Sequence, residues 1–112
     1  MRLSDVSKLF SALGISTYHG LIPEESDFPA VAITHVGEIS SRLADGTKVK
    51  YDTYRAIIAE QSNGKVEDLY DLFYKTYDNS VFNRKRMMIE SPQELFDTDE
   101  SVSKIGFDIN VY

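Results

Sequence analysis

The sequence contains no cysteine, only two histidines and no long hydrophobic run. The absence of cysteine excludes disulfides, thiolate metal ligands and cysteine nucleophiles, and it is typical of a protein made in a reducing compartment such as a cytoplasm. No segment approaches the ~20 consecutive apolar residues that a membrane-spanning helix needs, and the first residues lack the apolar run of a signal peptide. We therefore expect a soluble protein with no membrane partner.

Basic residues are also in short supply, with 12 Lys and Arg against 18 Asp and Glu and a net charge of -6. Proteins that bind nucleic acid mainly through its phosphates need clustered basic residues, so this balance argues against nucleic acid as the main partner. The basic cluster from Arg84 to Arg86 is typical of a solvated turn, although three neighbouring cations could also contact phosphate.

The composition that remains is that of a small globular domain. Hydrophobic residues make up 42% and charged residues 27% of the 112 positions, so the chain has enough apolar surface to offset its conformational entropy. Chains of this length bury one core and rarely divide it. The sequence predicts a single domain spanning residues 1–112.

Apolar spacing predicts a helix near the start of the chain, over about Ser4 to Leu13. Ser4 or Asp5 can cap it, and Gly14 can end it with a left-handed residue. Residues 16–28 contain Gly20 and Pro23 and have no sustained period, which predicts a loop. The apolar stripe of the helix comprises Val6, Leu9, Phe10 and Leu13.

The next segment is rich in residues that favour β-structure. Ala30 to Val36 predicts a first strand, and Gly37 predicts a turn or a bulge after it. Glu38 to Leu43 and Lys48 to Glu60 predict two further strands, joined where Asp45-Gly46 gives a strong hairpin signal.

The apolar alternation changes phase within the segment from Lys48 to Glu60. Val49 and Tyr51 share one parity, whereas the following apolar residues share the other, namely Tyr54, Ala56 and Ile58. One extra residue resets the alternation of a strand, so we expect a bulge near Asp52-Thr53.

Helical spacing returns after residue 64, and it predicts a helix over about Lys65 to Asp78. Asn79-Ser80 predicts a turn, and Met87 to Ile89 predicts a strand closed by Ser91-Pro92. The acidic residues 94–100 predict a loop or an irregular strand edge, and strict alternation over Ile105 to Tyr112 predicts the last strand. The apolar positions of the helix are Val66, Leu69, Tyr70, Phe73 and Tyr77.

This order of elements predicts an α+β fold, with an antiparallel or mixed β-sheet of about four to five strands and two helices packed mainly on one face. We expect six apolar side chains to lie in the sheet, beneath the helices: Val31, Ile33, Ile58, Ile105, Phe107 and Ile109.

Residues that could carry catalysis are few and scattered. His19 and His35 have no partner that the sequence makes visible, and the motifs GxSxG, HExxH, GxGxxG and the P-loop are absent. Asp97, Asp99 and Glu100 could hold a hard cation, but they do not match an EF-hand loop, so we favour a solvated acidic loop. The sequence predicts no enzymatic activity, no cofactor and no metal site.

A surface for protein contacts is the better prediction. The Asp45-Gly46 hairpin carries charged residues on both of its strands, and one tyrosine of the later helix lies off the apolar stripe. Complementary charges of this kind fix the register between partners, although charged strands also protect sheet edges in ordinary solvated hairpins. The candidate interface residues are Glu38, Arg42, Asp45, Lys48, Lys50 and Tyr74.

Several segments together resemble the tail-terminator and tail-completion proteins of tailed bacteriophages. They are Asp27 to Ile33, the Asp45-Gly46 hairpin, Tyr51 to Ile58, Val66 to Tyr77 and Ile105 to Tyr112. The resemblance implies a small α+β subunit that forms a ring, commonly sixfold, which ends the tail tube and faces the head connector. It also implies three partners, namely other copies of the chain, the tail-tube protein and a head connector or neck protein, with assembly in the host cytoplasm and a final place in the virion.

Two other interpretations stay open at this stage. In one, the protein is a different neck or head–tail connector component, or a relative from a contractile tail, with the same logic of assembly. In the other, it is a small enzyme or ligand-binding module whose site is built from residues distant in sequence. Electron microscopy of the purified protein would separate rings from monomers.

Overall fold

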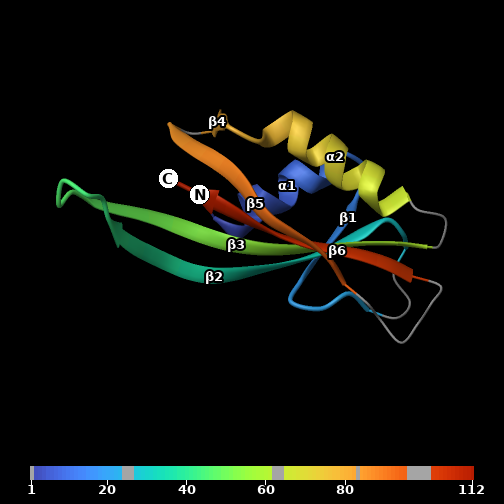
Figure 1. The fold of residues 1–112 in the computed structure, drawn as a ribbon. Helices are drawn as coiled ribbons and strands as arrows, with labels where there is room; N and C mark the ends of the chain where they lie inside the picture. Colours follow the sequence, from blue (N-terminus) through green and yellow to red (C-terminus); the bar gives the residue numbers. More distant parts are fainter. Residues whose placement is uncertain (1, 24–26, 62–64, 83, 96–101) are drawn as a thin grey trace.

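The computed structural model describes residues 2–23, 27–61, 65–82, 84–95 and 102–112, and the molecule is elongated, with extents of 48 × 26 × 23 Å. The described part of the chain forms one sheet of six strands in the order β1-β2-β3-β6-β5-β4, with two helices (Figure 1). In chain order the elements are α1 (Leu3–Ser11), β1 (Ser16–His19), β2 (Ala30–Arg42), β3 (Lys48–Gln61), α2 (Lys65–Tyr77), β4 (Ser80–Phe82), β5 (Lys85–Leu95) and β6 (Val102–Val111).

The sheet is mixed, because β1 runs parallel to β2 while every other neighbouring pair is antiparallel. The α+β class is therefore as predicted, but the predicted count of four to five strands was wrong. The additional strands are short edge strands, β1 with 4 residues and β4 with 3. Strands this short carry too few residues for an alternating pattern to be recognised.

Both helices pack on the same face of the sheet, which we call the helix face (Figure 1). Phe10 of α1 stacks on Phe73 of α2 with ring centroids 4.2 Å apart, and Phe107 of β6 lies 5.5 Å from Phe73. The predicted apolar residues of the sheet are confirmed, since all of them lie in strands and are buried: Val31, Ile33, Ile58, Ile105, Phe107 and Ile109.

Helix α1 begins at Leu3, so Ser4 and Asp5 lie inside its first turn and the prediction that one of them is the cap was wrong. Asp5 still stabilises this end, because its Oδ2 accepts the backbone N–H of Arg2 at 2.9 Å. Gly14 ends the helical region with a φ of +79°, as predicted.

Two predicted strand boundaries were also wrong. The bulge that was one of the two alternatives predicted at Gly37 is confirmed, but it lies within one continuous strand, β2, so the two separate strands predicted on either side of it are wrong. Ser91-Pro92 does not close β5 either, because Ser91 adopts a φ of +58° and pairing with β6 resumes at Gln93 after a register shift. Glu94 and Leu95 therefore belong to β5, whereas the predicted acidic loop beyond them, residues 96–100, lies outside the described residues.

The hairpin formed by β2 and β3 extends well past the rest of the sheet. β6 pairs with β3 only between Asp52 and Gln61, and β1 pairs with β2 only between Ala30 and Ile33. Residues 38–51 consequently form a two-stranded projection whose outer strand edges carry no neighbouring strand in the described chain, and we call it the arm (Figure 1).

Candidate interaction surface

The tip of the arm is a well-defined turn. The backbone N–H of Leu43 donates to the carbonyl of Thr47 at 2.9 Å, and Asp45 Oδ1 accepts the N–H of Thr47 at 2.9 Å. That hydrogen bond lowers the pKa of Asp45. Gly46 has a φ of +87°, a conformation that glycine adopts without steric cost. The Asp-Gly pair therefore forms the predicted hairpin turn.

The charged candidates lie together on one side of the arm, continuous with the helix face. Glu38, Arg42, Lys48 and Lys50 all have the strand parity of Asp52, which neighbours the core residue Tyr54 on that face. In the folded chain these side chains form one charged surface, in which Glu38 lies opposite Asp52 and Arg42 lies opposite Lys48. The order of the residues in the chain does not reveal this surface.

The charges of the arm are only partly balanced within the chain. Lys50 Nζ lies 3.8 Å from Glu38 Oε1, but both side chains are largely exposed, and such a pair stabilises little. Arg42 and Lys48 are direct cross-strand neighbours of like charge, an arrangement that destabilises a hairpin. Within the described residues neither of these two cations has an ion-pair partner, so the arm presents uncompensated positive charge.

The opposite side of the arm is apolar. Ile39 pairs directly with Tyr51, Val49 has the same parity, and the Tyr51 ring lies 4.7 Å from that of Tyr112. Ile39 is 38% exposed and Tyr112 is 40% exposed, since no helix of the described chain covers this side. This apolar side belongs to the face of the sheet turned away from the helices, which we call the far face.

The two sides of the arm explain the phase change in the sequence of β3. Its pairing with β6 is continuous, so the bulge predicted near Asp52-Thr53 is wrong; the extra residue is Val36, on the partner strand β2. In the body, β3 has apolar side chains on both faces, with Tyr54, Ala56 and Ile58 on the helix face and Ile57 and Ala59 on the far face. In the arm, its apolar side chains Val49 and Tyr51 lie on the far face alone. The phase change therefore marks the point beyond which β3 has no apolar side chain on the helix face.

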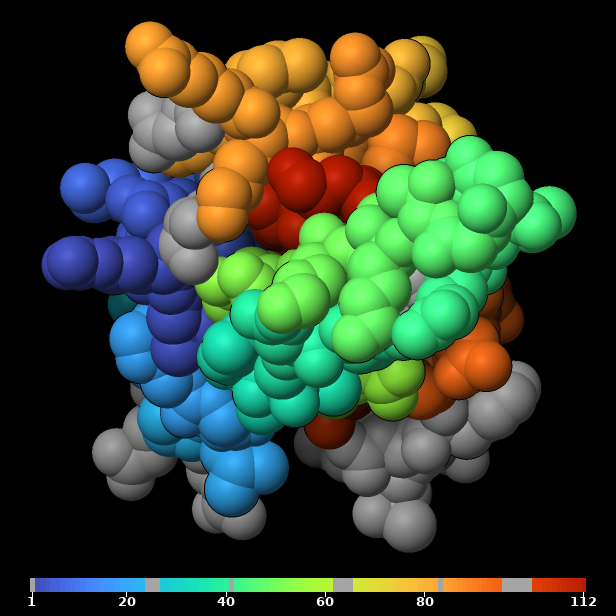
Figure 2. All heavy atoms as spheres, turned by 90° about the vertical axis from the view of Figure 1, so that its left-hand side faces the viewer, coloured from blue at the N-terminus to red at the C-terminus, as the bar shows by residue number. Residues whose placement is uncertain are grey.

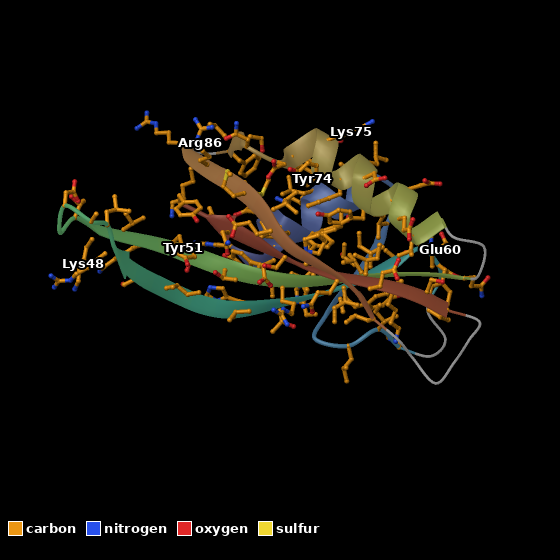
Figure 3. The ribbon with its side chains drawn as sticks, in the orientation of Figure 1. Lys48, Tyr51, Glu60, Tyr74, Lys75 and Arg86 are labelled. Carbon is orange, nitrogen blue, oxygen red and sulfur yellow. The ribbon has the colours of Figure 1, made fainter. Side chains whose placement is uncertain are left out.

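Tyr74 is not part of this surface. It lies on α2, away from the arm end that Lys48 marks in Figure 3, with its ring 6.0 Å from that of Tyr70. A hydrogen bond to the Asp78 side chain raises the pKa of Tyr74. The structure thus brings the hairpin candidates together and leaves Tyr74 as a separate exposed ring.

Positive charge extends from the arm to the turn between β4 and β5. Viewed end-on in Figure 2, the arm stands in front of the body and this turn lies above it, and Figure 3 places Arg86 and Lys48 at the same end of the molecule. Half of the chain's 12 basic residues belong to these two segments, and Lys50 and Lys85 line the same small hollow; the six are Arg42, Lys48, Lys50, Arg84, Lys85 and Arg86.

The other end of the molecule is acidic. Glu60, near the end of β3, lies at the end opposite the arm in Figure 3. Glu67 on α2 lies beside Glu94 on β5, and a hydrogen bond to Glu94 together with its negative charge raises the pKa of Glu67. Asp68 is exposed in the same first turn of α2. We call Glu60, Glu67, Asp68 and Glu94 the acidic end.

The far face carries an apolar hollow toward the acidic end and a polar band in its middle. The hollow has a volume of about 360 Å³ and is lined mainly by apolar side chains. In the polar band, Arg55 Nε donates to Asp108 Oδ1 at 3.1 Å, and Thr53 Oγ1 donates to Asn110 Oδ1 at 2.8 Å. The apolar residues of the hollow are Leu21, Ile22, Ala32, Ile57 and Leu95.

The two histidines lie on the neighbouring strands β1 and β2 and contact different partners. His19 Nε2 is 3.2 Å from Ser7 Oγ, and His35 Nε2 is 3.3 Å from Asp52 Oδ1, a partner that the sequence did not make visible. In the part of the chain that the structure describes, no three side chains of metal-binding type come together, and the proposed ligands Asp97, Asp99 and Glu100 lie outside it. Neither described helix has the length and apolar character to span a membrane.

Comparison with models of known protein families gives no match, and comparison with curated protein sequences gives none either. The function is therefore inferred from the surface just described.

Proposed function

We propose that this protein is a structural virion assembly protein that forms a ring, ends the phage tail tube and joins the tail to the head connector. The observation that carries the proposal is the arm, which projects from the body with an apolar side that the described chain leaves exposed. A projecting pair of strands costs chain entropy and gains few contacts within its own subunit. Such a feature is expected where a partner supplies the missing contacts.

A ring of identical subunits needs two different surfaces on each copy that fit one another, because the same contact repeats around the ring. The arm and the remainder of the body meet this need, since they lie at different ends of an elongated subunit. In this proposal the ring stops the polymerisation of the tube by covering its last layer and presents its other side to the connector. The protein itself performs no chemistry there.

The proposal can be tested by adding the purified protein to tail-tube protein that is polymerising in vitro. We expect tubes to stop growing and electron micrographs to show a ring at one tube end. The variant Arg42→Glu with Lys48→Glu should remain folded but lose this capping at low salt, because it reverses the uncompensated charge of the arm.

A control variant makes the same change in net charge elsewhere. Lys8→Glu with Lys75→Glu reverses two exposed cations on the two helices and should cap tubes as the unmodified protein does. Capping by the arm variant at both low and high salt would remove the arm from the interface. Tubes that grow unchanged in the presence of the unmodified protein would contradict the proposed function itself.

A further inference from the structure

The two ends of the subunit match one another in charge and in the arrangement of their faces. On the arm, cations lie on the helix face and apolar side chains lie on the far face. At the opposite end, Glu60 and Glu94 have the strand parity of helix-face residues, whereas Ile57 and Leu95 line the hollow on the far face.

This correspondence means that two copies can meet end to end without inverting either one. Cations would then lie beside carboxylates on the helix face, and apolar side chains beside the apolar hollow on the far face. We propose that the arm of one copy docks on the acidic end of a second copy, with Arg42, Lys48 and Lys50 facing Glu60 and Glu94 and with Ile39 and Tyr51 meeting the rim of the hollow. This inference rests on the proposed function, because it names the contact between neighbouring copies that closes the proposed ring.

Like charges lie close together at both ends of the subunit, and this supports a second copy of the chain as the partner that binds each end. Arg42 and Lys48 are like charges directly across two strands, and Glu67 and Glu94 are neighbouring carboxylates, so a hydrogen bond to Glu94 together with its negative charge raises the pKa of Glu67. Each arrangement is unfavourable in an isolated subunit. Both are relieved at once when opposite charges from another copy approach.

Nucleic acid is the other partner that a basic end could take. Its phosphates would be attracted to the cations of the arm, but they would not cover the apolar side formed by Ile39, Val49 and Tyr51. The basic end also contains the carboxylates of Glu38, Asp45 and Asp52. A protein partner with both acidic and apolar groups fits this surface better, and the same chain supplies one.

The test is a charge exchange between the two ends. Arg42→Glu with Lys48→Glu and, separately, Glu60→Lys with Glu94→Lys should each weaken self-association by roughly tenfold or more at low salt, as measured by sedimentation equilibrium. A chain carrying all four substitutions should regain most of the lost association, because the attraction is restored with its sign exchanged. Circular dichroism should show that every variant is folded.

The apolar side has its own matched pair of variants. Ile39→Asn places an amide on the far face of the arm, and Ser40→Asn places the same amide on the helix face one residue later. We expect the first to weaken association and the second to leave it nearly unchanged. Equal effects of the two would contradict docking through the far face.

The experiment distinguishes a wrong contact between the two ends from a wrong proposal that the protein forms a ring. If the unmodified protein associates but the fourfold variant does not recover, the arm does not dock on the acidic end and the inference is overturned. If the unmodified protein stays monomeric at every concentration, both the ring and its contact are wrong. Binding of DNA that is lost in Arg42→Glu with Lys48→Glu, with self-association unaffected, would assign the basic end to nucleic acid instead.

Discussion

Replacing Phe107 by alanine should reveal how much of the fold depends on the aromatic cluster beneath the helices. Phe107 is 1% exposed, and its ring lies 5.1 Å from Tyr70 in an edge-on geometry, 5.5 Å from Phe73 and 6.2 Å from Phe10. Truncating a buried phenylalanine costs about 3 to 5 kcal/mol, and the three ring neighbours favour the upper part of that range.

The assay is urea unfolding followed by far-ultraviolet circular dichroism, at protein concentrations low enough that self-association does not contribute. With a slope of about 2 kcal/mol per molar urea, the expected loss lowers the midpoint by roughly 2 M. If Phe107→Ala does not fold, Phe107→Leu should fold with a smaller loss. Leu72→Ala is the control, because Leu72 is 46% exposed on the outer side of α2 and should change stability by less than about 1 kcal/mol. A loss from Phe107→Ala no larger than that of the control would refute the assigned core.

Three further outcomes follow from the described contacts. Replacing His19 and His35 together by glutamine should leave assembly unchanged in the tube-capping assay, because the proposed capping involves no proton transfer; loss of capping in a folded protein would indicate that one of these rings has a role in it. Gly46→Ala should lower the free energy of unfolding by about 1 to 2 kcal/mol, since the turn holds residue 46 at a φ of +87° with no atom near a new Cβ; an unchanged midpoint would mean that the turn relaxes. Thr53→Val should lower the free energy of unfolding by about 1 to 3 kcal/mol, because the buried side-chain oxygen Oδ1 of Asn110 loses the hydroxyl that donates to it at 2.8 Å. Thermal melts compare this variant with Thr53→Ser, which keeps the donor and should lose less stability.

The elements with strong periodicity were predicted well from the sequence. The helix predicted over Lys65 to Asp78 is α2, which ends one residue earlier, and the alternating segment from Ile105 to Tyr112 is the greater part of β6. The Asp45-Gly46 turn was also predicted, because few residue pairs favour a hairpin so strongly. In each case a local physical preference and the tertiary structure agree.

The edge strands could not be predicted in this way. β1 has half-buried residues on both of its faces, and β4 is too short for any period to be visible. A proline inside a sheet is usually found on an edge strand, at the start of a strand or at a bulge. Here Pro92 lies at a bulge, and β5 continues beyond it. These features depend on the neighbouring strand, which local sequence does not specify.

The most informative error concerns the phase change in β3. The change of parity between Tyr51 and Tyr54 was attributed to a bulge near Asp52-Thr53, because one extra residue resets the alternation of a strand. The register with β2 and β6 shows an uninterrupted strand that has apolar side chains on both faces in the body and only on the far face in the arm. The pattern thus contained a signal for an exposed apolar surface, but pairing partners were needed to recognise it.

The separation of charge was likewise invisible along the chain. The acidic residues Glu60, Glu67 and Glu94 belong to three different elements. The order of the strands in the sheet is what places the turn between β4 and β5 at the same end of the molecule as the arm. The net charge of -6 does not indicate where charges lie, whereas the folded subunit has a basic end and an acidic end.

The most direct test of the central claim, that the chain assembles into a closed ring through its arm, is native mass spectrometry of the purified protein and of Arg42→Glu with Lys48→Glu at the same concentration. The account predicts one dominant closed species for the unmodified protein, sixfold if the resemblance to tail terminators holds, and mainly monomer for the variant. A monomer for both proteins, or an identical closed species for both, would contradict it.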